Sequence, residues 1–197
     1  MAEEWNTLIN KFTALCDERV ANASVLKREK SKVIMGYTCS FVPEEIAYAA
    51  GFIPFRLISG NIAIAEAEAH IPNIYCSLAR TYLELGLKGA YDFLDGIIFP
   101  YSCDTMRTLY QIWKVNVPNE FNFYSFLDTR IVTDSEAEEY LVTELEELLR
   151  KFEMFSGDII CHDKLREAIK VYNESRQLMG LLQLLSQLYG PLLRDRW

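Results

Sequence analysis

Residues 94–100 read Leu94-Asp95-Gly96-Ile97-Ile98-Phe99-Pro100 and form the clearest predicted strand of the chain. The run is short, continuous and apolar, which is typical of a strand that is buried on both faces of a parallel sheet. The loop Tyr101-Ser102-Cys103 follows, and a helix is predicted from Asp104 through Trp113. Strand, short loop and helix in this order form the repeating unit of an α/β fold.

The same unit recurs on both sides of this segment. Further strands are predicted at 33–37, 52–58 and 121–126, and a helix is predicted over 77–87. Another helix opens at Pro43-Glu44-Glu45, residue types that suit a first helical turn, and stops at Gly51. Because strands that alternate with helices require right-handed crossovers, we predict an α/β fold. Its parallel, Rossmann-like sheet has about four strands with flanking helices.

The two ends of the chain are predicted to be helical, which divides it into an N-terminal helix (1–30), an α/β domain (31–133) and a C-terminal helical segment (134–197). The basic run 27–32 is interpreted as a solvated connector. Ser135 and Glu138 have capping-box spacing, and a last helix is predicted over 163–188. The acidic residues between Asp134 and Glu147 are expected to form a solvated helix face, because burying them unpaired would be costly.

Composition and charge argue against nucleic-acid-binding, membrane-spanning and secreted proteins. The chain has 197 residues, half of them apolar, and a net charge of −8. It has no Lys/Arg cluster of the kind that tracks a phosphate backbone, which disfavours nucleic-acid binding. No apolar run approaches the roughly 18 residues that cross a bilayer, and the acidic N-terminus does not resemble a signal peptide. We therefore expect a soluble, cytoplasmic protein without a membrane segment.

Three of the five cysteines follow or precede regular elements in a way that suggests a shared site. Cys39 and Cys103 come directly after predicted strands, and Cys76 opens a helix with Arg80 about one turn later. Ligands of open parallel sheets bind outside the carboxyl ends of the strands, and a helix start favours the thiolate form of cysteine. The three thiols are thus expected at one edge of the sheet.

The residues alone leave the role of these thiols open. Their spacing matches no compact Cys-x-x-Cys pattern, and a free cysteine often packs as a small hydrophobic side chain. Cys16 and Cys161 are expected to be structural, and His70 and His162 to face solvent. Glu44 is a candidate for acid–base chemistry, although a charged first helical turn also explains it.

Three motifs resemble those of a known family. The segments 36–46 and 48–56 resemble the opening motif of the 2-hydroxyacyl-CoA dehydratase and benzoyl-CoA reductase subunits. The segments 75–80 and 91–105 resemble the second and third motifs of that family, in the same order. The resemblance covers essentially residues 14 to 180.

The resemblance implies an iron–sulfur enzyme subunit that acts on a CoA thioester through a ketyl radical. It places two ligands of a [4Fe-4S] cluster on Cys76 and Cys103, with Cys39 as a possible third. Cys39 and Glu44 become the candidate catalytic residues. The implied partners are an acyl-CoA substrate, a second family subunit and an ATP-hydrolysing iron–sulfur activator that delivers an electron.

The family's subunits are much longer than this chain and supply a further cysteine from a second α/β half. We therefore expect the remaining ligands to come from outside these residues. The apolar residues of the last predicted helix favour a homodimer or a partner chain. The alternative is a non-catalytic, truncated family domain that serves as a partner-binding or assembly module.

Overall fold

The computed structural model describes residues 2–57, 62–118, 123–128 and 135–194, and within these ranges four parallel strands form one sheet. The strands are β1 (Ile34–Tyr37), β2 (Ile53–Arg56), β3 (Gly96–Pro100) and β4 (Phe123–Leu127). Their order across the sheet is β2-β1-β3-β4. The predicted α/β fold is therefore confirmed.

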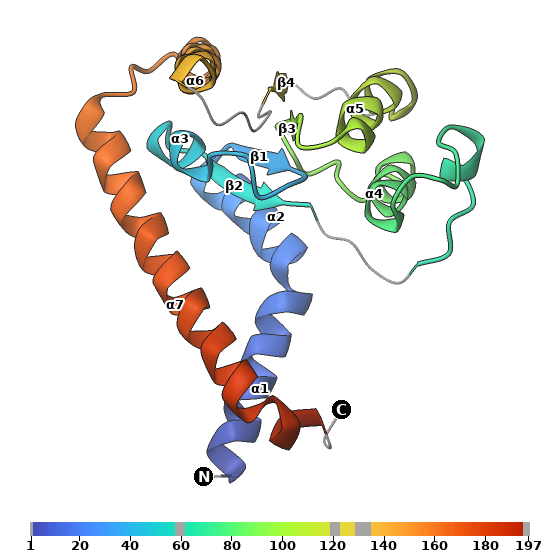
Figure 1. The fold of residues 1–197 in the computed structure, drawn as a ribbon, viewed down its shortest axis with the longest axis vertical. Coiled ribbons are helices and arrows are strands. Elements are labelled where there is room, and N and C mark those ends of the chain that lie inside the picture. Colours follow the sequence, from blue (N-terminus) through green and yellow to red (C-terminus); the bar gives the residue numbers. More distant parts are fainter. Residues whose placement is uncertain (1, 58–61, 119–122, 129–134, 195–197) are drawn as a thin grey trace.

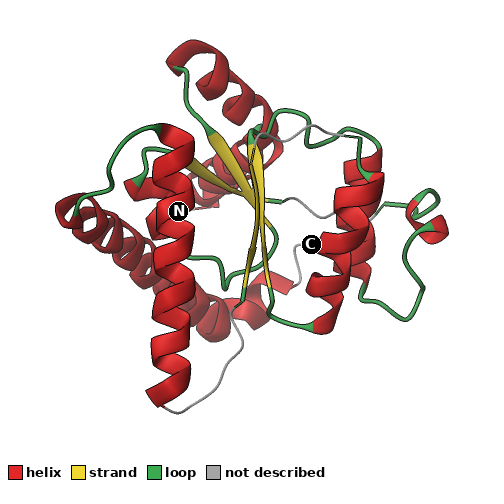
Figure 2. Cartoon of the chain, turned by 90° about the horizontal axis from the view of Figure 1, so that it is seen from above, coloured by secondary structure: helices red, strands yellow, loops and turns green. Residues whose placement is uncertain are grey.

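Helices cover both faces of this sheet (Figures 1 and 2). One face packs against α2 (Arg19–Lys30), α4 (Ser77–Leu87) and α5 (Asp104–Asn116). The other face packs against α3 (Glu44–Ala49), α6 (Ser135–Ser156) and α7 (His162–Arg194). Successive strand residues alternate between the two faces, as the pleat of a strand requires.

The α4/α5 face has a tightly packed aromatic core. Trp113 is fully buried, and its ring centroid lies 5.8 Å from that of Tyr91 and 5.5 Å from that of Phe99. Helix α4 approaches this core at Gly86, where an added Cβ would lie 2.7 Å from the Trp113 ring. Only a glycine therefore permits this approach of α4 to α5 without rearrangement.

The α7 face is only partly closed. Phe52 and Phe152 pack edge to face at 5.1 Å, and Ala168 of α7 is fully buried. Beyond this region α7 extends away from the sheet, toward the same end of the molecule as α1 (Ala2–Asp17) (Figure 1). Large apolar side chains are exposed on both helices: Leu8, Phe12, Leu15, Leu178, Met179, Leu181, Leu182, Leu184 and Leu185.

Two sequence-based interpretations of the first helices are wrong. The basic run at 27–32 is mostly helical, and Lys27 is not simply solvated: its ammonium lies 2.9 Å from the Asp95 carboxylate and donates a hydrogen bond to the Phe93 carbonyl oxygen. Cys16 is exposed, because the apolar side chains around it on α1 are themselves left uncovered by the described residues.

The predictions for Cys161, the two histidines, the acidic residues of α6 and the last helix have mixed outcomes. Cys161 is exposed between α6 and α7, where it was expected to be packed. His70 and His162 are exposed, as predicted, and the described acidic residues of α6 lie mainly on its solvated face. Helix α7 continues to Arg194, beyond its predicted end.

None of the helices within the described residues has both the length and the apolar character that crossing a bilayer requires.

Candidate functional site

Cys39 and Cys103 follow the carboxyl ends of two neighbouring strands, at the point where the direction in which strands are added to the sheet reverses. Cys39 comes two residues after β1, and Cys103 comes three residues after β3. The chain adds β2 on one side of β1 and then β3 on the other, so β1 and β3 flank the topological switch point. Open α/β sheets bind ligands at this position.

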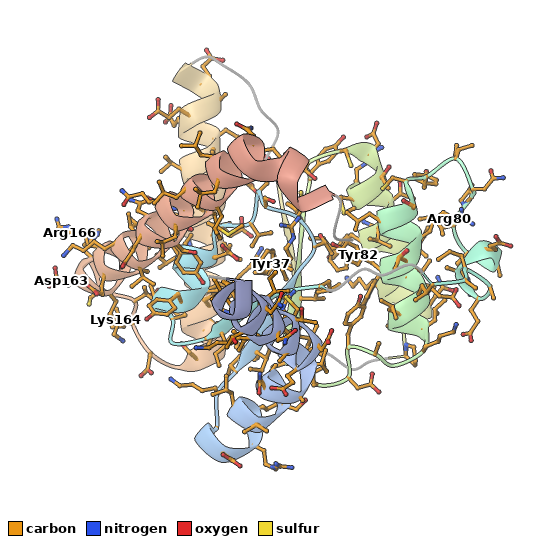
Figure 3. The ribbon with its side chains drawn as sticks, turned by 90° about the horizontal axis from the view of Figure 1, so that it is seen from below. Tyr37, Arg80, Tyr82, Asp163, Lys164 and Arg166 are labelled. Carbon is orange, nitrogen blue, oxygen red and sulfur yellow. The ribbon has the colours of Figure 1, made fainter. Side chains whose placement is uncertain are left out.

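Cys76 stands at the N-cap of α4, a helix that contacts the end of β1 through Tyr82. Tyr82, a buried residue of α4, donates a hydrogen bond from its hydroxyl to the Thr38 carbonyl oxygen at 3.2 Å. Burial raises the pKa of Tyr82, the charge and a hydrogen bond of Arg56 oppose this rise, and charges at Cys39 and Cys76 add smaller increases. Both thiols therefore lie within electrostatic range of one phenol. Figure 3 shows Tyr82 on the α4 side of the molecule and Tyr37 near its centre.

A buried carboxylate anchors the loop that carries Cys76. Glu84 has no exposed surface and accepts hydrogen bonds from the backbone N–H groups of Ala65, at 3.1 Å, and Ala67, at 2.8 Å. Its second oxygen lies 2.6 Å from the Lys88 ammonium. Burial acts to raise the pKa of Glu84, but the hydrogen bonds from Ala67 and Lys88 outweigh it and lower the pKa to about 2. Glu84 is therefore ionised and holds this loop against α4.

The described residues alone do not fit a [4Fe-4S] cluster. Cys76 and Cys103 are exposed and Cys39 is half-buried, but no group of three or more His, Cys, Asp or Glu side chains within the described ranges is placed to hold a metal ion. Because such a cluster is commonly held by four thiolates, this part of the chain offers an incomplete set of ligands. The assignment of Cys76 and Cys103 as ligands stays a prediction.

A groove of about 820 Å³ opens next to Cys39, between the ends of β1 and β2 and helix α7. Its sheet side includes Tyr37, Ser40, Glu44 and Arg56, and its α7 side includes Tyr172, Arg176, Met179, Gly180 and Leu182. This volume is within the range of small-molecule sites, roughly 300–1,000 Å³. The lining residue Ser40 follows Cys39 directly in the sequence, although Cys39 itself does not line the groove.

Glu44 supplies the groove with a carboxyl group whose pKa lies above its ordinary value. The Tyr37 hydroxyl donates a hydrogen bond to the Glu44 carboxyl. Burial raises the pKa of Glu44, the neighbouring charge of Glu45 raises it further, and Arg176 and Arg56 oppose this rise. A carboxyl with a raised pKa keeps its proton closer to neutral pH, which is the property a general acid needs.

Helix α7 is tied to this site across a long sequence separation. The Arg176 guanidinium forms an ion pair with Glu45, the residue next to Glu44. The Tyr172 ring packs edge to face on Tyr48 of α3 at 5.9 Å between centroids. Burial raises the pKa of Tyr172, and the charges of Glu44 and Glu45 add to the effect.

The sequence analysis selected Cys39 and Glu44 but missed the two tyrosines and two arginines that line the groove. Tyr37 and Arg56 are the last residues of β1 and β2, so the rule that selected Cys39 would have found them if it had been applied to the strand ends themselves. Tyr172 and Arg176 have no local signal, because only the packing of α7 on α3 brings them to the groove.

Comparison with known proteins places these residues in a family. A model described as "2-hydroxyglutaryl-CoA dehydratase, D-component" matches residues 39–192, which include the candidate cysteines, Glu44 and most of α7. The chain belongs to this family. The predicted resemblance is thereby confirmed.

Curated relatives within the dehydratase family agree with this assignment. The chain is 34% identical to a component of the benzoyl-CoA reductase of Thauera aromatica over 86% of its own length and 42% of that protein. It is 31% identical to the (R)-2-hydroxyglutaryl-CoA dehydratase beta subunit of Acidaminococcus fermentans over 87% of its length and 45% of that protein. It is 29% identical to the (R)-phenyllactyl-CoA dehydratase beta subunit of Clostridium sporogenes over 76% of its length and 40% of that protein. The chain thus spans less than half the length of these relatives.

Proposed function

We propose that this chain forms the N-terminal part of an iron–sulfur subunit of a cytoplasmic 2-hydroxyacyl-CoA dehydratase or benzoyl-CoA reductase. Such an enzyme acts on a CoA thioester by single-electron, ketyl radical chemistry. Its partners would be an acyl-CoA substrate, a second family subunit or the remaining half of a subunit, and an ATP-dependent iron–sulfur activator. The observation that carries the proposal is the family match, which spans Cys39, Cys76, Cys103 and every lining residue of the groove except Tyr37.

Cys76 and Cys103 are the residues we assign to the metal. Each thiol stands at the N-cap position of a helix, before α4 and α5 respectively, where the peptide dipoles favour a thiolate. Tyr75, the residue before Cys76, donates a hydrogen bond to Thr108 of α5 at 3.4 Å, which links the two helix starts. Because the described residues do not complete a ligand set, the other ligands would come from another part of the polypeptide or from a partner.

Glu44 and Cys39 are the residues we assign to the substrate side. The Glu44 carboxyl lines the groove with a raised pKa, and Tyr37 holds it by a hydrogen bond. In its acid form Glu44 is suited to protonate a leaving hydroxyl or a developing anion on the substrate. Cys39 directly precedes the lining residue Ser40 and would stand beside the same space.

A second candidate function is a non-catalytic family domain that binds a partner. The incomplete ligand set and the exposed leucines of α7 favour it. This alternative predicts a protein that carries no iron and whose cysteines can all be titrated.

The two functions are separated by anaerobic purification followed by assays of iron and acid-labile sulfide. We expect the enzyme subunit to bind iron and sulfide after reconstitution and to lose both in Cys76→Ser and Cys103→Ser. Cys16→Ser and Cys161→Ser are matched controls, because these exposed thiols lie on α1 and between α6 and α7, away from the strand ends. Metal binding that survives both of the first substitutions would contradict the ligand assignment. A protein that stays free of iron, even with its partner subunit added, would favour the binding domain.

A further inference from the structure

Gly180 is an unexplained glycine in the exposed half of α7. Glycine in a helix interior is unfavourable by roughly 1 kcal/mol relative to alanine, so its presence calls for a reason. A Cβ built at Gly180 meets nothing within 4 Å among the described residues, so neighbouring helices do not require it. Gly86 of α4 is different, because the Trp113 ring occupies the space beside it.

The missing side chain at Gly180 opens directly onto the groove. Gly180 lies between Met179 and Leu181 on α7 and is one of the groove's lining residues, together with Met179 and Leu182. Opposite them, the sheet side carries the Glu44 carboxyl and the Arg56 guanidinium. The α7 side also carries polar groups, including Arg176 and Gln183, so its apolar part is the stretch around Gly180 that Met179 and Leu182 form.

We propose that Gly180 is a specificity-determining residue that lets the apolar acyl chain of an acyl-CoA lie against the backbone of α7, with the thioester toward Glu44. This inference rests on the proposed function and adds the position of the acyl chain and the residue that limits its size. Glycine is the residue that permits close approach of a ligand to the backbone. An aliphatic chain matches the contacts that Val42, Met179 and Leu182 offer in the groove.

The test is a binding series on the full chain with free CoA, acetyl-CoA, butyryl-CoA and hexanoyl-CoA, measured by isothermal titration calorimetry. For the wild type we expect the affinity to rise about fourfold for each methylene that the groove covers. Gly180→Phe fills the groove, so its affinities for the four ligands should be equal. Gly180→Ala adds only one methyl group, so its affinity should still increase from free CoA to acetyl-CoA and from acetyl-CoA to butyryl-CoA.

Gln177→Phe is the matched control, since it adds the same ring to α7 at a position that does not line the groove. It should leave the wild-type series unchanged, and circular dichroism should show equal helix content in all variants. The proposal is overturned if the wild type binds hexanoyl-CoA and free CoA with equal affinity. It is equally overturned if the affinity of Gly180→Phe still increases with the length of the acyl chain. It is also overturned if Gly180→Phe instead weakens self-association, which would make the groove an interface between two copies. Iron binding by the same preparations reports on the proposed function separately.

Discussion

Glu84 and Glu44 lie on opposite sides of the same sheet and are held in opposite ways. Glu84 is fully buried, yet two backbone N–H groups and Lys88 keep its pKa at about 2. Glu44 is half-buried, and its burial together with the charge of Glu45 raises its pKa, although Arg176 and Arg56 oppose the rise. Burial alone therefore does not set the charge of a carboxyl group; it acts together with the hydrogen-bond donors and the neighbouring charges that the fold supplies.

The same contrast extends to the packing of the two faces. The α4/α5 face closes around Trp113 and leaves no room at Gly86. The α7 face leaves a groove and a row of exposed leucines. The closed face supports the loops that carry Cys76 and Cys103, and the open face offers space for a ligand.

Replacing Glu84 should have the largest effect on stability. Glu84→Leu leaves the backbone N–H groups of Ala65 and Ala67 without their acceptor, and we expect the free energy of unfolding to fall by about 3 kcal/mol. Urea denaturation at neutral pH measures this loss. Lys88→Met is the milder control, because Lys88 is exposed and its removal leaves both backbone hydrogen bonds in place.

The pH dependence of stability tests the charge of Glu84 independently. Its pKa is about 2 in the folded protein against the ordinary value of 4.5, so its contribution is present above 4.5 and is lost as the pH falls toward 2. Glu84→Leu should lack this component of the acid denaturation. Parallel loss of stability in the variant and the wild type between these pH values would show that Glu84 is not ionised as described.

The two helical glycines should respond to alanine with opposite signs. Gly86→Ala forces a methyl group against the buried Trp113 ring, and overpacking of this kind outweighs the gain in helix propensity, for a net loss of about 1–2 kcal/mol. Gly180→Ala meets open space and should raise the free energy of unfolding by about 0.5–1 kcal/mol. Thermal denaturation of both variants measures the difference. Equal effects would mean that the α4/α5 face is no more tightly packed than α7.

Glu44→Gln should stabilise the protein slightly near neutral pH, by less than about 1 kcal/mol. Because the folded-state pKa is raised, the contribution of Glu44 is present below the ordinary value of 4.5 and is lost as the pH rises through the folded-state pKa. The gain from the substitution should therefore grow with pH from 4.5 upward. NMR titration of the Glu44 side-chain carbon measures the pKa directly, and Glu45→Gln should lower it by removing the neighbouring charge. A Glu44 pKa at or below 4.5 would contradict the acid role.

The smallest change in stability is expected for the exposed leucines of α7. Leu181→Lys combined with Leu185→Lys should alter the free energy of unfolding by less than about 0.5 kcal/mol each, as for other surface substitutions. The same pair should weaken self-association, which we expect of the wild type at micromolar concentrations because this row of apolar side chains is uncovered. Sedimentation velocity measures it, with Gln177→Lys as a charge control. A wild type that stays monomeric would leave these leucines to a different partner.

The fold was predictable because its signals are local. Continuous apolar runs such as 96–100, helix starts such as Pro43-Glu44 and the order of strands and helices can all be read within short windows, and the structure confirms them. The placement of Cys39 and Cys103 after strands followed from the same reading, since a parallel sheet gathers the carboxyl ends at one edge. The exposure of Cys16 was mispredicted, because periodicity indicates an apolar face but not whether another element covers it.

The sequence thus specified the α/β architecture, the family and the residues that stand at the ends of β1 and β3, because each depends on neighbours along the chain. The charge and the surroundings of individual side chains depend instead on packing between segments that are far apart in the sequence. Arg176 reaches Glu45 across 131 positions of sequence, and Ala65 and Ala67 donate to Glu84 from a separate loop. Whether a carboxyl holds its proton, and whether a helical glycine meets a tryptophan ring or open space, follows from which distant groups the fold brings to it.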